Sequence, residues 1–102
     1  MRRGDIYYIE HPELGRRPVL VLTRDDAIPV LRRVLVASIS RRVRGIATEV
    51  QLDIDDGMPE ACAVNLDNVT DAWKAMLVSH VTTLSESRMW EVCRALNAAV
   101  GC

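Results

Sequence analysis

The sequence is poor in aromatic residues and contains no phenylalanine. Aromatic side chains make up 4% of the 102 residues, so valine, leucine, isoleucine, alanine and methionine must fill any core. Hydrophobic residues reach 49% and charged residues 26%. This composition is that of an ordinary globular protein. The length predicts a single domain over residues 1–102.

Long apolar runs and paired cysteines are also missing. No segment approaches the ~20 consecutive apolar residues that a membrane-spanning helix needs, and the charged N-terminus lacks the apolar stretch of a secretory signal. Cys62, Cys93 and Cys102 fit neither a disulfide framework nor a zinc-binding spacing. We therefore expect a cytoplasmic protein without a membrane partner, in which Cys62 and Cys93 are buried as small apolar side chains.

Positive charge comes almost entirely from arginine and is unevenly distributed along the chain. The net charge is −1, yet residues 1–45 hold ten arginines against five acidic residues. Residues 46–102 hold three basic residues against nine acidic ones. Arginine presents a planar fork of donors that suits phosphate groups. The alternative is a solvated surface, and for Arg32, Arg33 and most of the other arginines the sequence favours neither interpretation.

The first two-thirds of the chain predict short strands separated by turns. Each expected strand is rich in apolar or β-branched residues and is bounded by turn residues. The six expected strands cover residues 5–10, 18–23, 33–40, 48–54, 61–66 and 76–82. A turn is expected over residues 11–16, followed by Pro18 as the first residue of its strand. Residues 67–71 are expected to form a turn or a short helical turn.

The last part of the chain predicts a helix. Ser85 is expected to cap a helix that runs from Glu86 to about Val100, and Gly101 can end it. Apolar residues recur at helical spacing at Met89, Val92, Cys93, Leu96 and Val100. The order of elements predicts an α+β fold, in which a small antiparallel, barrel-like sheet carries a C-terminal helix across it.

Few sequence motifs point to chemistry. There is no glycine-rich nucleotide loop and no metal-binding motif, so we expect no cofactor and no metal. His11 and His80 could act as an acid–base pair, but they lie far apart in the sequence. Arg17, directly before a buried strand, and Ser40, at the end of the next long strand, are more informative. An arginine and a hydroxyl group at neighbouring strand ends can form a phosphate pocket.

Six segments carry a resemblance to a known family. They are RRGDIYYI (2–9), GRRPVLVLTRD (15–25), VLVASIS (34–40), TEVQLDI (48–54), MPEACAVNLDNV (58–69) and LSESRMWEVCRALNAAVG (84–101). In this order, and over nearly the whole chain, they resemble the MazF/PemK family of toxin ribonucleases.

The resemblance implies both a fold and an activity. The fold would be an SH3-like antiparallel β-barrel with a C-terminal helix, working as a homodimer. The activity would be metal-independent cleavage of single-stranded RNA at short motifs, leaving 2′,3′-cyclic phosphate and 5′-hydroxyl ends. Such a toxin would inhibit translation and growth until an acidic, partly disordered antitoxin occupies its RNA site.

The resemblance also assigns roles to particular residues. The family's catalytic arginine falls on Arg17, and its catalytic threonine falls on Ser40, which keeps the hydroxyl group. The family's Asp-Gln pair falls on Asp67 and Asn68. Its acidic loop residue has its nearest counterpart in Glu13, within a shortened loop. Further RNA contacts are expected from the arginines near these positions, namely Arg16, Arg24, Arg41, Arg42 and Arg44.

Two other functions compete with RNA cleavage. A non-enzymatic toxin on the same fold would bind gyrase through its C-terminal residues, here near 97–102. It would not need Arg17 or Ser40. An SH3-like adaptor would bind a peptide in a groove, and we expect such a groove to need more aromatic side chains than the two tryptophans and two tyrosines present.

Overall fold

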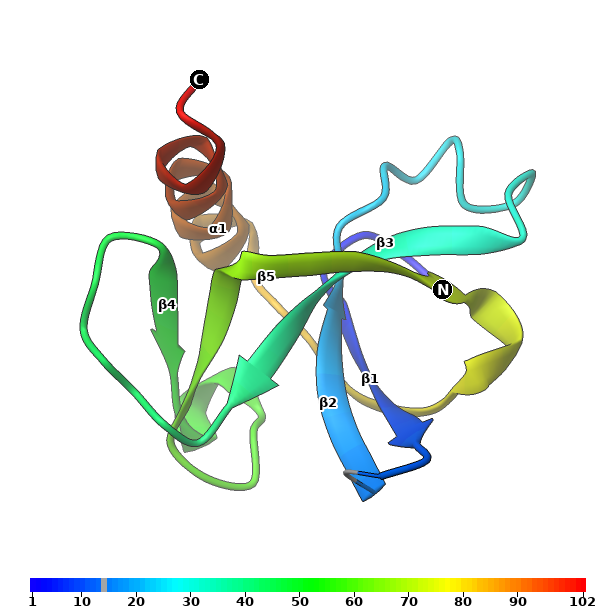
Figure 1. The fold of residues 1–102 in the computed structure, drawn as a ribbon, viewed down its shortest axis with the longest axis horizontal. Helices are drawn as coiled ribbons and strands as arrows, with labels where there is room; N and C mark the ends of the chain where they lie inside the picture. The colour runs from blue at the N-terminus through cyan, green and yellow to red at the C-terminus, as the bar shows by residue number, and fades with distance from the viewer. Residues whose placement is uncertain (14) are drawn as a thin grey trace.

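Six antiparallel strands form one strongly curled sheet in this computed structural model, which describes residues 1–13 and 15–102 without the side chain of His11 (Figure 1). Neighbouring strands follow the order β4-β5-β3-β2-β1-β6. The elements are β1 (Asp5–His11), β2 (Gly15–Val21), β3 (Arg33–Ser40), β4 (Glu49–Leu52), η1 (Ile54–Asp56), β5 (Cys62–Trp73), η2 (Lys74–Met76), β6 (Leu77–Thr83) and α1 (Glu86–Val100). The expected α+β fold, with its antiparallel barrel-like sheet and C-terminal helix, is confirmed.

The two faces of the sheet bury two apolar clusters. Alternation along β2 sends Leu20 to one face and Val19 and Val21 to the other. The larger cluster, which includes Leu20, lies against α1 and contains Met89 and Val92 of that helix. The helix therefore anchors one side of the sheet, next to β4 and β5 (Figure 1).

The helix α1 has the ends that its sequence predicts. The Ser85 hydroxyl accepts a hydrogen bond from the Arg88 N–H at 3.2 Å, and Gly101 closes the helix with a φ of 73°. Val100 continues the apolar spacing but is 61% exposed. Cys93 is only half-buried, in contrast to its expected burial, while Cys62 is buried as expected. No helix in the described part of the chain is long and apolar enough to cross a bilayer.

The expected start of the second strand was wrong. β2 begins at Gly15, so Pro18 lies inside the strand and the turn after β1 is shorter than residues 11–16. β2 pairs with β3 only from Val19 onward, so Pro18 has a neighbouring strand on one side only. Proline is tolerated at such edge positions, because a donor is not needed on the open side. Leu14, which also belongs to the expected turn, lies outside the described residues.

The expected turn over residues 67–71 was also wrong. These residues belong to β5, which runs without a break from Cys62 to Trp73. The pairing of β5 with β3 is irregular, because Ser38 pairs with Asn65 while the preceding Ala37 pairs with Val69. The residues between are left over as a bulge, where β5 bends sharply (Figure 1). Their polar, turn-like composition reflects this bulge.

Substitution of Gly57 tests how tightly the segment after η1 packs. Its φ is 92°, and a Cβ there would overlap Thr82 Oγ1 and lie 2.8 Å from Thr82 Cβ. We expect Gly57→Ala to lower the free energy of unfolding by more than the ~1–2 kcal/mol of a left-handed non-glycine residue alone. Urea unfolding measures the loss.

Gly45→Ala is the matched control. Gly45 also has a positive φ, of 68°, but the nearest atom to its added Cβ is 3.9 Å away. Gly45→Ala should therefore lose only the unfolding free energy that a positive φ costs a non-glycine residue, without a steric overlap. Equal losses in the two variants would contradict the close packing of Gly57 against Thr82.

Candidate active site

Arg17 and Ser40 lie where β2 and β3 separate, and both line one pocket. The last pairs recorded between these strands are Val21↔Val36, Leu20↔Ala37 and Val19↔Ser38. Continuing this register by two residues places Arg17 opposite Ser40, and residues opposite each other on antiparallel strands share a face. The strand ends splay apart at this point (Figure 1).

A pocket of about 170 Å³ lies between the separated strand ends. Its polar lining comes from Tyr8, Arg16, Arg17, Ser40, Arg41 and Glu60, and its apolar lining from Pro18, Ile39, Met58, Pro59 and Cys62. Four elements or their flanking loops therefore contribute to one small basic pocket. The combination predicted from the sequence, an arginine and a hydroxyl group at neighbouring strand ends, is brought together here.

The Ser40 hydroxyl is oriented by the backbone of the loop that follows it. Its Oγ accepts a hydrogen bond from the Arg42 N–H at 3.0 Å. A serine hydroxyl has one hydrogen to donate in addition to its acceptor lone pairs. The Ser40 hydrogen can therefore point to a ligand oxygen in the pocket.

Arg17 and Arg16 differ in how strongly they are held. Arg16 donates to Ser79 Oγ at 2.8 Å and stacks over the Tyr8 ring at 4.5 Å, with Glu10 at 3.9 Å. No described residue forms an ion pair with the exposed Arg17 guanidinium. Arg17 thus carries the positive charge that an anion in the pocket can use.

A second pocket, of about 230 Å³, shares Ser40 with the first. Its other lining residues are Arg42, Arg44, Glu49 and Asn65. The Arg44 Nε lies 2.9 Å from Glu49 Oε2, and the N–H groups of Arg44 and Gly45 donate to Oε1 at 2.8 and 3.1 Å. Arg44 is therefore tied to the fold, which leaves Arg42 as the more available cation.

The Glu49 carboxylate organises the basic loop over residues 41–47. Burial by itself would raise the pKa of Glu49, but the hydrogen bonds from the Arg44 side chain and from the Arg44 and Gly45 amides outweigh it. Together they hold the pKa of Glu49 below its ordinary value. The carboxylate stays ionised and fixes the loop that follows Ser40.

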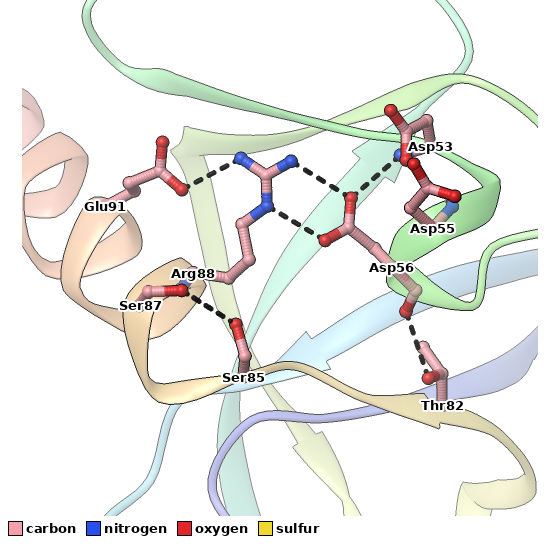
Figure 2. Close-up of polar contacts among 8 residues, drawn as sticks. All are labelled: Asp53, Asp55, Asp56, Thr82, Ser85, Ser87, Arg88 and Glu91. Atoms are coloured by element: carbon pink, nitrogen blue, oxygen red, sulfur yellow. Dashed lines mark hydrogen bonds and ion pairs between the residues drawn. The ribbon is translucent and has the colours of Figure 1, made fainter.

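The wall of the first pocket that residues 58–60 form is tied to α1 through Asp56. Asp56 ends η1, just before the wall residues 58–60. Its two carboxylate oxygens accept from Arg88 Nε at 2.8 Å and from the Arg88 terminal nitrogen at 3.2 Å, while Arg88 also donates to Glu91 at 2.9 Å (Figure 2). The Asp56 carbonyl accepts from Thr82 Oγ1 at 3.1 Å. The helix and β6 thus fix the position of the wall.

Cys62 lines the pocket but is not a nucleophile. Burial raises the pKa of the Cys62 thiol to about 11, and the negative charges of Glu60, Asp56 and Asp53 add to this shift. The reactive form of cysteine is the thiolate. At neutral pH Cys62 is therefore an apolar part of the pocket wall.

Arg24 was expected to contact RNA, but the structure does not bring it to either pocket. It follows the other end of β2 and pairs with Asp26 at 2.9 Å. The four strand steps from Arg17 to Val21, at about 3.3 Å each, already span about 13 Å, and Arg24 lies three residues beyond. The sequence shows charge but does not show which end of a strand it occupies.

Three other expected site residues line neither pocket. Glu13 is in the turn between β1 and β2, outside the lining residues of both pockets. Asp67 and Asn68 are exposed at the bulge in β5, where Asp67 accepts a hydrogen bond from Thr48 Oγ1 at 2.6 Å. We expect their contribution, if RNA reaches them, to come from outside the Arg17–Ser40 pocket.

Glu60 and Asn65 line the pockets but were not expected as site residues. The sequence contains a signal for Asn65, because this residue is the polar interruption of the apolar run from Cys62 to Leu66. It contains no such signal for Glu60, because this residue enters the pocket from the loop after η1, far from Arg17 in the sequence.

The alternative acid–base pair of histidines is not supported by the strand register. His80 pairs with Tyr7 of β1, four residues before His11. This separates the two backbone positions by about 13 Å along the strand. The His80 Nε2 lies 3.1 Å from Thr83 Oγ1 and 3.4 Å from Asp5 Oδ1. His80 thus belongs to a network that links β6 to Asp5 of β1.

The comparisons with known proteins define the class. Residues 2–100 match the model of the family described as PemK-like, MazF-like toxin of type II toxin–antitoxin system. The chain belongs to this family. It is similar to two proteins of Mycobacterium tuberculosis strain H37Rv. "Probable endoribonuclease MazF5" is 48% identical over 98% of this chain and 93% of its own length. "Probable endoribonuclease MazF2" is 37% identical over 100% of both.

Solved structures agree with the fold. The Mycobacterium tuberculosis toxin MazF-mt6 superimposes with a TM-score of 0.87 at 32% identity, over 95% of this chain and 96% of that chain. A mycobacterial endoribonuclease solved in complex with its cognate antitoxin has a TM-score of 0.89 at 23% identity, over 99% of this chain and 95% of that one. The second likeness supports the fold alone.

The Asp56–Arg88 clamp predicts a pH-dependent part of the stability. Burial would raise the pKa of Asp56, but the hydrogen bonds from Arg88 and the Asp53 amide outweigh it and lower the pKa. Its stabilisation is therefore complete above the ordinary carboxylate pKa near 4 and is lost as the pH falls below it. We expect Asp56→Asn to cost about 2 kcal/mol at pH 7, and to flatten the acid side of the stability curve.

Urea unfolding between pH 7 and pH 3 tests this clamp. Asp26→Asn is the matched control, since Asp26 forms an exposed pair with Arg24. Such pairs contribute about 0–1 kcal/mol. An Asp56→Asn variant as stable as the wild type at pH 7 would contradict the clamp.

Proposed function

We propose that residues 1–102 act as one cytoplasmic toxin domain that cleaves single-stranded RNA without a metal. The observation that carries this proposal is that Arg17 and Ser40 line one basic pocket. The register of β2 and β3, continued beyond Val19↔Ser38, supports it. Membership of the toxin family and the endoribonuclease names of the two relatives support it. Growth arrest would follow from the loss of intact RNA for translation.

The proposed reaction uses the RNA's own 2′-hydroxyl as the nucleophile. Its oxygen attacks the adjacent phosphorus, and the bond to the 5′-oxygen breaks, leaving a 2′,3′-cyclic phosphate and a 5′-hydroxyl. Negative charge develops on the phosphorane oxygens. The Arg17 guanidinium stabilises this charge, and the Ser40 hydroxyl donates to a non-bridging oxygen. Both residues belong to strands, Arg17 to β2 and Ser40 to β3.

The RNA path passes over Ser40, because this residue borders both pockets. A strand with its cut phosphate at Arg17 and Ser40 would place flanking nucleotides at the two pockets. Arg16, Arg41 and Arg42 can meet phosphates, while the Asn65 amide can read a base edge. The shortened loop after β1 would influence which bases are accepted.

The toxin family and the charge of the pockets indicate which partners the protein binds. We expect a cognate antitoxin whose acidic, partly disordered segment enters the same basic pockets and competes with RNA. We also expect the toxin to work as a homodimer. Salt should weaken antitoxin binding as well as RNA binding, because both depend on the same arginines.

The gyrase-binding alternative has less support. The two relatives described above carry endoribonuclease names. A gyrase poison would have no use for an arginine held opposite a hydroxyl group in a pocket. The adaptor alternative is weaker still, since Tyr8 is the one aromatic residue among the described lining residues of the two pockets.

RNA cleavage in excess EDTA tests the proposed function. We expect the wild type to cut long single-stranded RNA at a recurring short motif and to leave 5′-hydroxyl ends. Arg17→Ala and Ser40→Ala should each lower kcat by roughly 10²–10³, as expected when one transition-state donor is removed. Ser40→Thr keeps the hydroxyl and should retain most activity. Mapping of fragment ends and single-turnover rates measure these effects.

Arg24→Ala is the control for charge loss, since Arg24 lies outside both pockets. It should cut at the wild-type rate. Cleavage that survives both Arg17→Ala and Ser40→Ala would remove these residues from the mechanism. A folded wild type that cuts none of several RNAs would contradict the endoribonuclease proposal and favour gyrase binding.

Salt dependence tests the proposed phosphate contacts. The logarithm of the affinity for RNA with a 2′-deoxy cleavage site should fall linearly with the logarithm of salt concentration. Arg42→Ala should weaken binding and reduce that slope by about 0.7, the value for one phosphate contact in a single strand. Fluorescence anisotropy measures both quantities. An unchanged slope in Arg42→Ala, equal to that of Arg24→Ala, would place the phosphates elsewhere.

A further inference from the structure

The proposed mechanism leaves one proton without an acceptor. The attacking 2′-hydroxyl must lose its hydrogen, yet Arg17 is permanently protonated and Ser40 is assigned as a donor. Cys62 is a thiol whose pKa is raised to about 11. A metal-free ribonuclease needs a base within reach of the 2′-oxygen, in the same pocket as the scissile phosphate.

Glu60 is the carboxylate among the described lining residues of this pocket. Its Oε1 lies 3.4 Å from the Nε of Arg41, which directly follows Ser40. Its side chain is 52% exposed, so an RNA strand can reach it. The carboxylate thus lines the same pocket as Arg17 and lies close to the end of β3.

The segment that leads to Glu60 is fixed by contacts with α1, β6 and the core, as a catalytic base requires. The wall segment follows Asp56, which Arg88 grips with two hydrogen bonds (Figure 2). Two residues between Asp56 and Glu60 are also closely packed. Gly57 lies against Thr82, and Met58 is buried in the main core. These contacts position the backbone next to Glu60, and none of them involves the turn that carries Glu13.

We infer that Glu60 is the general base of the RNA cleavage, an inference that rests on the proposed function. The Glu60 carboxylate takes the proton of the 2′-hydroxyl while the 2′-oxygen bonds to phosphorus. The bond from phosphorus to the 5′-oxygen then breaks, and the leaving oxygen takes a proton from water. The resulting hydroxide and the carboxylic acid neutralise each other, which restores the carboxylate. Arg41 holds the carboxylate toward the pocket and is a positioning residue.

Single-turnover cleavage of an oligoribonucleotide that contains the wild-type cut site tests this role. We expect Glu60→Gln to slow the chemical step by roughly 10²–10⁴, the range for loss of a general base. Its affinity for the same oligonucleotide with a 2′-deoxy cut site should be equal to or higher than that of the wild type, because a negative charge is removed. Glu60→Asp should recover part of the rate.

Chemical rescue separates a base from a structural residue. Formate is a small carboxylate that can occupy the space left in Glu60→Ala, and it should increase the cleavage rate of that variant. Chloride at the same ionic strength should not. Urea midpoints check that each variant is folded, and Asp26→Asn controls for removal of an acidic charge outside the pocket.

The outcomes for the two proposals are distinct. A wild type that cleaves RNA, together with a Glu60→Gln variant that cleaves at the same rate, would overturn the role of Glu60 and leave the proposed function intact. The role of Glu60 as a base would also be overturned if Arg41→Ala is as slow as Glu60→Gln and formate rescues nothing. A wild type without RNA cleavage would overturn both.

Discussion

The register between β2 and β3 is the constraint on which the proposed site depends. Three consecutive pairs, ending at Val19↔Ser38, set the two strands relative to each other. Their side chains alternate between two buried clusters, so a slip of one residue would send apolar side chains to the wrong face. The same register carries Arg17 and Ser40 to opposite positions on one face. Core packing thereby sets the positions of the proposed functional pair, which is itself exposed.

A pocket also requires that the paired strands stop pairing. Pro18 lacks the N–H that would continue a ladder, and it lies where β2 has lost β3 as a neighbour. The gap is bounded on its far side by residues 58–60, which the Asp56–Arg88 contact ties to α1. The helix is therefore part of the site's architecture, although none of its residues lines the pocket between β2 and β3.

Charge is arranged more finely than its distribution along the chain suggests. The arginine-rich first part of the chain meets the acidic second part in pairs such as Arg44–Glu49, Arg41–Glu60 and Arg33–Asp71. These contacts use much of the positive charge for folding or for holding a carboxylate. No described carboxylate is paired with Arg17, so its charge remains available to a phosphate. A count of arginines by itself would overstate the number of RNA contacts.

The sequence determined several of the elements and the class of protein. Alternation in β3 and the helical spacing after Ser85 predicted those elements within their observed bounds, and ordered motifs over most of the chain carried the family. The sequence also predicted that Arg17 and Ser40 lie in one pocket, because both are near strand ends. Local patterns succeed there because alternation and helical spacing depend on neighbours in the chain.

The tertiary structure decided the rest. The bulge in β5, the isolation of Arg24 and the entry of Glu60 into the pocket all depend on contacts between distant segments. Strand pairing places residues in space by register, and a loop such as the one after η1 brings a side chain to a site without a local signal. The sequence supplied the chemical groups, while long-range packing chose which of them meet.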